Sequence, residues 1–421
     1  LLADALSTAR ALTIEDYRAR ALAAVAPHLP EPRRTQVLAE VLGAARALTD
    51  EDSWARVLET LVPHLPEALL ADALSTARTL TNEYARARVL EAVASHLPDT
   101  LLADALSTAR TLTNEYSWAQ ALAAVAPHLP EPKRTQVLAE VLGAARAFTN
   151  KYSAAQALAA VAPHLPDTLL ADVLDAAVAL TFEYYRAQAL AAVAPHLPDT
   201  LLADVLDAAV ALTDKYSQVQ VLETVVPHLP DTLLADALST ARTLTDKYYR
   251  ARALAAVAPH LPEPERAQVL AEALDAAHAL TNGYPRVRVL AAVAPHLPDP
   301  ERAQVLAEAL DAARALTNED ARAQALETLA SHLTGDQLSD GLALASDESS
   351  VRALLLRVEE TSPKADDLSR VSFLRAALHR KNQTVVLACI AGAASSIMGA
   401  GGSEAVSRCS RAVRDVARWW P

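Results

Sequence analysis

A three-residue tag, His-Leu-Pro, recurs through most of the chain at steps of only 32 or 36 residues. Some of the segments between the tags are identical, as in Leu69–Arg78 and Leu101–Arg110. Periods of this length are typical of solenoids, in which each unit is one supersecondary element stacked on the next. A divergent copy, His-Leu-Thr, begins at His332. The tag itself begins at His28, His64, His96, His128, His164, His196, His228, His260 and His296.

Each repeat has the pattern of two helices joined by a turn. In Leu101–Leu112 the apolar residues recur with helical spacing, and a second apolar stripe follows to Val125, before Pro127 and Pro130. Asp99 is placed to cap the first helix, and Asn114 marks the turn. Hydrophobic residues make up 52% of the chain but aromatic residues only 4%, so alanine and leucine, both good helix formers, supply the apolar content.

The two repeat lengths support helices over strands. Four extra residues advance a helix by about one turn plus 40°, which keeps its apolar stripe nearly in phase. The sequence therefore predicts an all-α superhelical solenoid of 32/36-residue helix-turn-helix repeats with a divergent C-terminal helical cap. We expect ten tandem hairpins over 1–332, a degenerate hairpin over 333–362 and capping helices over 363–421. Because Leu1–Arg10 repeats Leu101–Arg110, we expect the chain to be a piece of a longer protein.

The sequence lacks the common catalytic and phosphate-binding motifs. It contains no Gly-Lys pair, no Gly-x-Ser-x-Gly and no Cys-x-x-Cys, so we expect no enzyme activity and no cofactor. The repeated histidines are expected to cap helix ends, since layers about 8–10 Å apart do not suit metal bonds of about 2 Å. We therefore expect no metal site.

Charge and apolar run length bear on the partners and the compartment. The net charge of −13 argues against a nucleic-acid partner. The apolar run Thr384–Met398 is shorter than the roughly 20 residues of a membrane span, so no membrane association is expected. Cys389 and Cys409 are too few for a disulfide framework, which indicates a reducing, cytoplasmic setting.

Two columns vary between repeats that are otherwise nearly identical. On the first helix, an arginine gives way to Val178, Val210 and His278 in the repeats where a serine becomes an aspartate. If first helices line the concave side, these columns form a groove with a basic flank and an acidic centre. The candidate binding residues there are Arg10, Arg46, Arg78, Arg110, Arg146, Arg242 and Arg314, with Asp172, Asp175, Asp204 and Asp207.

The second variable column opens the second helix and contains Trp54 and Trp118 among several arginines. Tryptophan and arginine are common interface anchors, which makes both tryptophans candidate binding residues. The alternative is that the tryptophans pack between repeats and the arginines pair with acids of the next repeat. Gln120, Gln156 and Gln188 of the second helices are expected to face outward and to contribute little to binding.

The tag and the terminal run Arg414–Pro421 resemble the C-terminal repeats of bacterial signal-transduction NTPases of the NACHT and NB-ARC type (STAND, NLR-like). The units are also tetratricopeptide-like in length and helix order. The NTPase resemblance implies a sensor module for a protein or peptide ligand, with an upstream NTPase or effector domain and a role in signalling or antiphage defence. Two alternatives remain open, namely a constitutive protein–protein scaffold and a regulatory arm of an enzyme such as a protease.

Overall fold

The computed structural model describes residues 2–46 and 50–345, and, beyond these, 347, 349–350, 352–354 and 357. The side chains of Arg46 and Asp336 are outside this description. Throughout the described residues the elements are helices and their connecting turns, and the chain is an all-α solenoid of helix-turn-helix repeats, as predicted. The predicted degenerate hairpin is described mainly at α21 (Asp336–Leu344), and the predicted cap over 363–421 lies outside the described residues.

The chain divides into two compact units, Leu1–His228 and Leu229–Pro421, a division that the repeat pattern does not predict. The first helices of unit 1 are α1 (Leu2–Arg10), α3 (Arg33–Arg46), α5 (Glu67–Ala77), α7 (Asp99–Arg110), α9 (Lys133–Ala147), α11 (Asp167–Val178) and α13 (Asp199–Val210). Its second helices are α2 (Glu15–Val25), α4 (Glu51–Leu61), α6 (Glu83–Ala94), α8 (Glu115–Val125), α10 (Lys151–Val161), α12 (Glu183–Val193) and α14 (Lys215–Val225).

Unit 2 repeats the same hairpin. Its first helices are α15 (Asp231–Thr243), α17 (Glu265–His278) and α19 (Asp299–Arg314), and its second helices are α16 (Lys247–Val257), α18 (Gly283–Val293) and α20 (Glu319–Ala330). In a repeat of 36 residues the first helix is longer than in a repeat of 32, with 16 residues in α19 against 12 in α7. The predicted extra turn is therefore present in α19.

The ends of each helix follow from local chemistry. In α8 the side chain of Asn114 accepts a hydrogen bond from the Ser117 amide, so Asn114 caps the second helix. After Val125 the chain tightens into a 3₁₀ turn that contains a proline and ends at the tag histidine, as in η3 (Ala126–His128). The predicted cap Asp99 is instead the first residue of α7, and Pro98 occupies the cap position.

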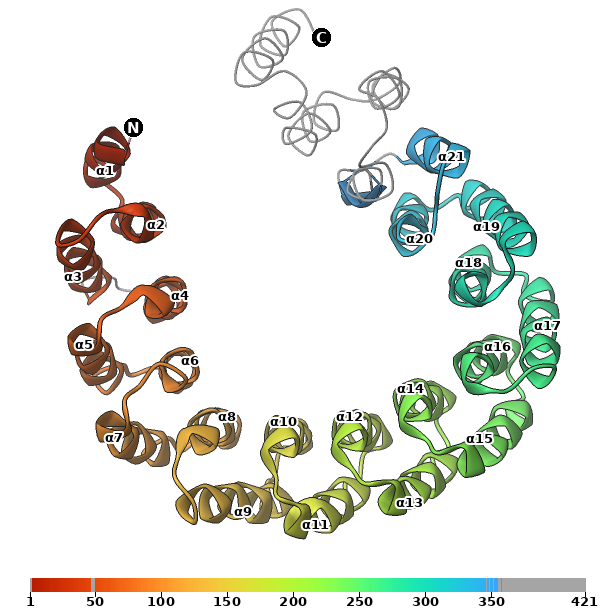
Figure 1. Cartoon of the computed structure of the whole chain (residues 1–421), viewed down its shortest axis with the longest axis horizontal. Coiled ribbons are helices and arrows are strands. Elements are labelled where there is room, and N and C mark those ends of the chain that lie inside the picture. Colours follow the sequence, from red (N-terminus) through yellow and green to blue (C-terminus); the bar gives the residue numbers. More distant parts are fainter. Residues whose placement is uncertain are drawn as a thin grey trace, which may run out of the picture. The chain divides into compact units, whose positions relative to one another are not determined.

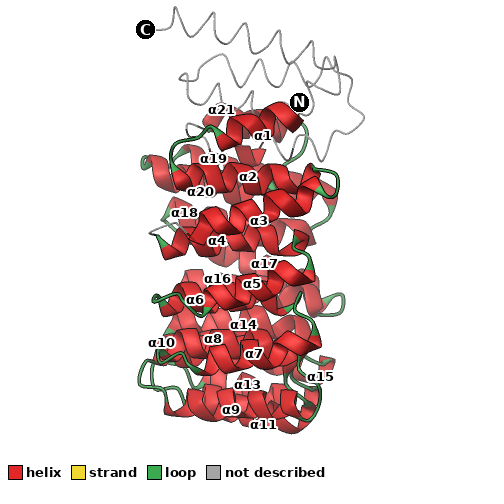
Figure 2. Cartoon of the chain, turned by 90° about the vertical axis from the view of Figure 1, so that its left-hand side faces the viewer, coloured by secondary structure: helices red, strands yellow, loops and turns green. Residues whose placement is uncertain are grey.

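The second helices form the inner layer of the curve in unit 1, and the first helices form the outer layer (Figure 1). Unit 2, taken by itself, has the same order of layers. Successive second helices of unit 1 contact one another much more extensively than successive first helices do. Figure 2 shows the first helices α3, α5, α7 and α9 lying in successive layers across the stack. The expectation that first helices line the concave side is therefore wrong in both units.

Alanine and leucine on the second helices explain this close packing. In α8, Ala119 and Ala121 are at most 1% exposed, and Leu122 is fully buried between the two layers. The same three positions are buried in the neighbouring α6, α10 and α12. Small side chains allow adjacent helices to approach, and the leucine row supplies most of the buried apolar area.

A carboxylate clasp joins successive hairpins of unit 1. Glu83, the first residue of α6, accepts hydrogen bonds from the backbone amides of Thr113 (2.8 Å) and Asn114 (2.7 Å) and from the Thr113 hydroxyl (2.7 Å). These two residues form the turn of the next repeat. Glu51, Glu115 and Glu183 make the same three bonds to their following turns.

The clasp is interrupted between α10 and α12. Lys151 occupies the glutamate position and donates to the Phe148 carbonyl of its own repeat at 2.7 Å. The following turn carries Phe182 in place of asparagine or aspartate, and its side chain caps no backbone amide. Both halves of the clasp have therefore changed together at this junction.

Replacing Glu83 with alanine should weaken the junction between α6 and α8. Loss of three hydrogen bonds to a partly exposed carboxylate should cost about 1–2 kcal/mol and speed amide hydrogen exchange at Thr113 and Asn114. The matched control is Glu67→Ala, which removes an exposed first-turn acid of α5 without a clasp. Equal effects from both substitutions would show that the helix dipole, and not the clasp, accounts for the loss.

Acid should weaken unit 1 through the same carboxylates. The backbone amide of Asn114 holds the pKa of Glu83 below its ordinary value of 4.5, and the backbone amide of Asp214 does the same for Glu183. A carboxyl with a lowered folded-state pKa contributes stability above its unfolded pKa and loses it as the pH falls. Thermal unfolding should therefore shift to lower temperature below about pH 4.5. The fall in unfolding temperature per unit of pH should be smaller in the double variant Glu83→Ala/Glu183→Ala than in the wild type.

Candidate functional site

The arginines predicted to bind a ligand instead form a ladder between successive first helices. Arg10 makes a bidentate contact with Glu40 of α3, with Nε–Oε1 at 3.0 Å and Nη2–Oε2 at 2.5 Å. Arg146 reaches the Asp172 carboxylate of α11 at 3.1 Å. Equivalent links to the next first helix join Arg78 to Asp104, Arg110 to Glu140 and Arg242 to Glu272. These pairs connect repeats on the outer layer, and any ligand contact by the arginines stays a prediction.

Several predicted residues of this column do not join the ladder. Arg314 pairs with Asp311 of its own helix, and Arg46 ends α3 with a side chain outside the described part. Asp175, Asp204 and Asp207 are exposed on the outer layer beside Val178 and Val210, which are 40% and 50% exposed. Of the predicted acidic centre, the structure pairs only Asp172 with an arginine of the ladder, and the other three aspartates lie exposed. The glutamate partners were missed because sequence variation alone does not show which outer residues face each other.

Trp54 is buried in the stack, and Trp118 is half-buried. Trp54 is 2% exposed, and Trp118 packs edge-on against Phe148 of the next repeat, with ring centroids 6.2 Å apart. Both tryptophans thus pack between repeats, as the alternative expected, and a ligand contact by either stays a prediction. The arginines of this column mostly bond the carbonyl six residues before them, as Arg186 does to Leu180 at 2.8 Å. Arg286 differs, because it pairs with Glu308 of the next repeat.

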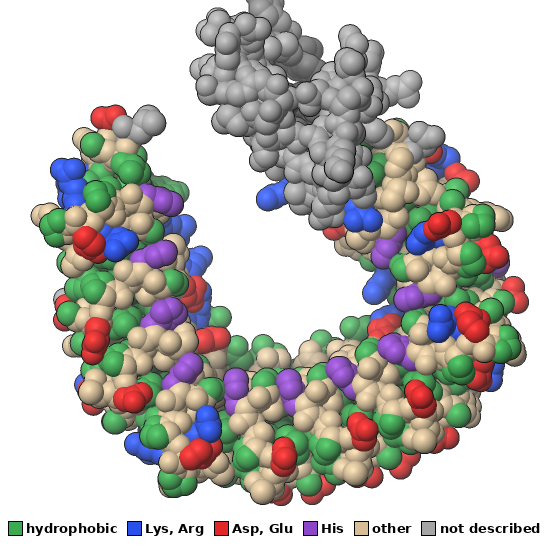
Figure 3. Space-filling view, viewed as in Figure 1, with side chains coloured by type: hydrophobic (Ala, Val, Ile, Leu, Met, Phe, Trp, Pro, Cys, Tyr) green, Lys and Arg blue, Asp and Glu red, His purple; other side chains and the backbone are tan. Residues whose placement is uncertain are grey.

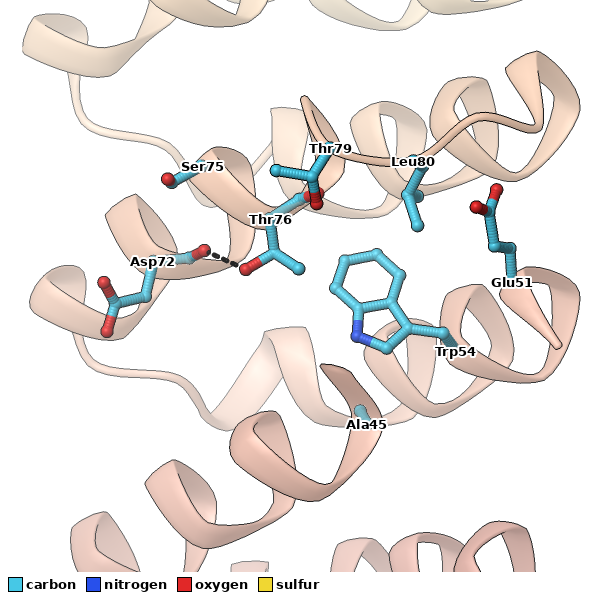
Figure 4. A pocket seen from close by; sticks show the side chains of 8 residues that line it. All are labelled: Ala45, Glu51, Trp54, Asp72, Ser75, Thr76, Thr79 and Leu80. Atoms are coloured by element: carbon cyan, nitrogen blue, oxygen red, sulfur yellow. Dashed lines mark hydrogen bonds between the residues drawn. The ribbon is translucent and has the colours of Figure 1, made fainter. Parts of the chain in front are cut away.

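Trp54 borders a cavity of about 530 Å³ between α3, α4 and α5 (Figure 4). The Thr76 hydroxyl on its wall bonds the Asp72 carbonyl at 2.8 Å, and the Trp54 indole N–H has no hydrogen-bond partner among the described residues. Ala45 also lies on the wall. The side chain of the next residue, Arg46, and residues 47–49 are outside the described part of the chain. We assign no ligand to this cavity.

The inner surface of unit 1 carries a different set of side chains. In α8, Tyr116, Gln120 and Ala124 are only partly buried and lie four residues apart, so they share one face of the helix. A groove of about 340 Å³ lies on this face, and every residue that lines it belongs to a second helix. Its lining residues are Glu91, Tyr116, Gln120, Gln156, Ala157, Ala159 and Ala160. Gln120 and Gln156, expected to face outward, lie on this inner surface instead.

Tyrosine rings form a row along the inner surface. The Tyr84 and Tyr116 rings stack with centroids 6.2 Å apart, and Tyr116 and Tyr152 stack at 5.9 Å. The row continues from Tyr152 to Tyr185 at 6.0 Å and from Tyr184 to Tyr216 at 6.4 Å. Tyr84, Tyr152, Tyr184 and Tyr216 are each 42–47% exposed, although tyrosine is large and mostly apolar. The signal for this row was a tyrosine at the second position of many second helices, which we did not single out from the sequence.

Glutamines form a parallel row one helical turn further along, at Gln120, Gln156, Gln188 and Gln220. Earlier in unit 1 the same position is arginine, and Arg88 pairs with Glu59 of the preceding repeat at 2.6 Å. Gln120 retains that geometry and donates to Glu91 at 2.7 Å. From Gln156 to Gln220 the partner position is alanine, as in Ala123 and Ala159. The middle of the inner surface is therefore polar but uncharged.

A row of exposed histidines runs along unit 1 near the inner edge of the face seen in Figure 3. Partial desolvation of the ring, together with neighbouring imidazoles, lowers the pKa of His128 and His164, which favours their neutral forms. Neither imidazole bonds a carbonyl among the described contacts, so the predicted capping bond is absent there. The described residues contain no group of three or more His, Cys, Asp and Glu placed to hold a metal ion. No helix of the described part is both long and apolar enough to cross a bilayer.

No protein-family model matches the sequence, and no curated protein matches it. The karyopherin Kap121p bound to the SUMO protease Ulp1p is similar with a TM-score of 0.41 and 12% identity, over 95% of this chain and 55% of that one. Ton1535 from Thermococcus onnurineus NA1 is similar with a TM-score of 0.26 and 14% identity, over 81% of this chain and 95% of that one. A circular tandem repeat protein is similar with a TM-score of 0.20 and 15% identity, over 99% of this chain and 87% of that one.

The chain thus spans 55% of the length of the karyopherin it matches. At these TM-scores and identities the similarity concerns the helical-repeat fold and gives no information on function. The resemblance to bacterial NTPase repeats gains no support from these matches and stays a prediction. The helices and turns of the described residues themselves form a helical-repeat solenoid.

Proposed function

We propose that the chain is a protein-recognition module that binds a protein or peptide partner on the inner surface of unit 1, without enzymatic activity of its own. The observation that carries this proposal is the row of exposed tyrosines beside a groove of about 340 Å³. Tyrosine supplies large contact area at low entropic cost and is enriched at protein interfaces. Even after they stack on one another, Tyr84, Tyr152, Tyr184 and Tyr216 keep 42–47% of their surface exposed and available to a partner.

The outer layer is less suited to a ligand. Its arginines are already paired with acids of the next repeat, so a ligand would have to compete with these ion pairs. Neither Asp175 nor Asp207 lines the cavity at Trp54 or the groove of about 340 Å³. We therefore place recognition on the second helices and not on the first.

The wider setting proposed for this module is the sensor of a larger cytoplasmic signalling or antiphage-defence NTPase. Support comes from the repeat tag and the terminal run Arg414–Pro421, both features of the sequence. The full-length gene decides between this setting and its rivals. An upstream phosphate-binding loop supports the NTPase setting, whereas an upstream protease domain, or no further domain, contradicts it.

Recognition on the inner surface should be lost when the tyrosine row is removed. Protein fragments encoded by the host genome would be displayed on phage and selected against the full chain. Fragments that bind should lose more than tenfold in affinity for Tyr152→Ala/Tyr184→Ala, because these exposed rings supply contact area. Circular dichroism would check that the variant retains its helix content.

The matched control is Asp175→Ala/Asp207→Ala, which alters two exposed residues on the outer layer of the same unit. Affinity for this variant should change by less than threefold. Greater loss from the aspartates than from the tyrosines would contradict the proposal and return recognition to the first helices.

A further inference from the structure

In two repeats a tyrosine of the second helix has an arginine of its own helix over its ring. The guanidinium carbon of Arg88 lies 5.8 Å from the centroid of the Tyr84 ring in α6. In α16 of unit 2, the guanidinium carbon of Arg252 lies 5.5 Å from the centroid of the Tyr248 ring. Both arginines follow their tyrosine by four residues, which places the two side chains on one face of the helix. Separations within about 6 Å are those of an attractive cation–π contact.

Along the chain between α6 and α16, four tyrosines have a glutamine at the position of that arginine. Gln188 donates to the Tyr184 hydroxyl at 3.1 Å, so its amide lies at the polar edge of the ring. A primary amide carries no positive charge. This position therefore supplies no cation to the four rings. The four pairs are Tyr116 with Gln120, Tyr152 with Gln156, Tyr184 with Gln188, and Tyr216 with Gln220.

Stacking within the tyrosine row is compatible with a cation over a ring. Tyr84 stacks on Tyr116 with ring centroids 6.2 Å apart, and it also carries the guanidinium of Arg88. Tyr84 is 45% exposed with both contacts in place. Tyr152 and Tyr216 are each 42% exposed and stack on a neighbouring ring in the same way. These two rings thus have the setting in which Tyr84 holds a cation, without the cation.

Acidic residues stand at both ends of this stretch. Glu91 lines the groove of about 340 Å³ together with Tyr116, and Glu223 has the same place on α14 that Glu91 has on α6. From α8 to α14, no lysine or arginine occupies the positions of the tyrosines, of the glutamines or of these glutamates. The net charge of −13 also attracts basic protein surfaces from a distance. The charges on the inner surface therefore favour a cationic partner over an anionic one.

The basic side chains of α10, α12 and α14 are engaged near the turns that precede these helices. Each donates a hydrogen bond within its own repeat, and two of the acceptors are carbonyls of those turns. These cations therefore lie toward the turns and not along the glutamine row. The bonds run from Lys151 to the Phe148 carbonyl at 2.7 Å, from Arg186 to the Leu180 carbonyl at 2.8 Å, and from Lys215 to Gln218 at 3.2 Å.

We propose that the tyrosines of α8, α10, α12 and α14 bind arginine or lysine side chains of a basic protein partner. The partner's cations would take the place that Arg88 fills at Tyr84. This proposal rests on the proposed function and specifies the chemistry of the partner. It also gives the glutamines a role, because they keep the position polar while leaving the ring without a cation of the chain's own.

A fluorescent hexa-arginine peptide is the first probe, and the full chain is the target. Its neutral match is a hexa-citrulline peptide, because citrulline replaces the guanidinium with an uncharged group of nearly the same shape. Fluorescence anisotropy should show at least tenfold weaker binding of the citrulline peptide. The protein fragments displayed on phage provide the second probe.

Gln188→Arg tests the site itself, because it supplies Tyr184 with the kind of cation that Arg88 supplies to Tyr84. The affinity for hexa-arginine and for the displayed fragments should fall at least fivefold. The matched control is Gln136→Arg on the outer helix α9, where Gln136 is exposed and the change in net charge is the same. Affinity for the control should change by less than twofold.

A second pair of variants separates the ring from its hydroxyl group. Tyr184→Phe keeps the aromatic face and should bind both probes within twofold of the wild type. Tyr184→Leu removes the aromatic face while keeping an apolar side chain, and its affinity should fall at least fivefold. Equal losses in the two variants would point to the hydroxyl group and contradict the proposal.

Two further results would overturn the inference. Equal losses in Gln188→Arg and Gln136→Arg would show that net charge alone governs binding. Fragments that depend on Tyr152 and Tyr184 but bind Gln188→Arg as tightly as the wild type would remove the cationic partner and leave the proposed function intact. Fragments that bind without any dependence on these tyrosines would remove both.

Discussion

Close packing of the second helices is the constraint on which the rest of this structure depends. Alanines such as Ala119 and Ala121 let α8 lie against its neighbours, while the first helices remain further apart. The layer with the closer packing becomes the inner side of each unit. The tyrosine rings are brought into stacking contact by the same approach, so the candidate surface is a direct result of how the core is filled.

The repeat period and the apolar stripes were sufficient to predict the hairpins, because they depend on local helical geometry. They did not determine which layer lies inside, since both helices of a hairpin bury one face and expose the other. That choice follows from the difference in packing distance between the two layers. The prediction therefore placed Arg110 on the concave side and Gln120 outward, and both assignments were wrong.

Tyrosine and arginine illustrate the same limit at the level of single residues. The variation at Arg78 and Arg146 was visible in the sequence, but their partners in the next repeat were not, because helix order does not give the register between layers. The tyrosine row was not predicted, because its residues vary little between repeats and the predicted site rested on variable columns. A residue that recurs without being buried was the better guide to the candidate surface.

The clasp also has a consequence for how such a chain changes length. A complete hairpin contains both kinds of half. Its turn donates to the glutamate of the preceding repeat, and its own glutamate accepts from the turn of the following repeat. A copied hairpin thus arrives with one half ready for the repeat before it and the other for the repeat after it. Insertion of a hairpin that carries both halves leaves its two junctions chemically complete, and the inner layer grows by one second helix. Duplication of such a hairpin can in this way lengthen the inner surface without rebuilding the junctions that hold it.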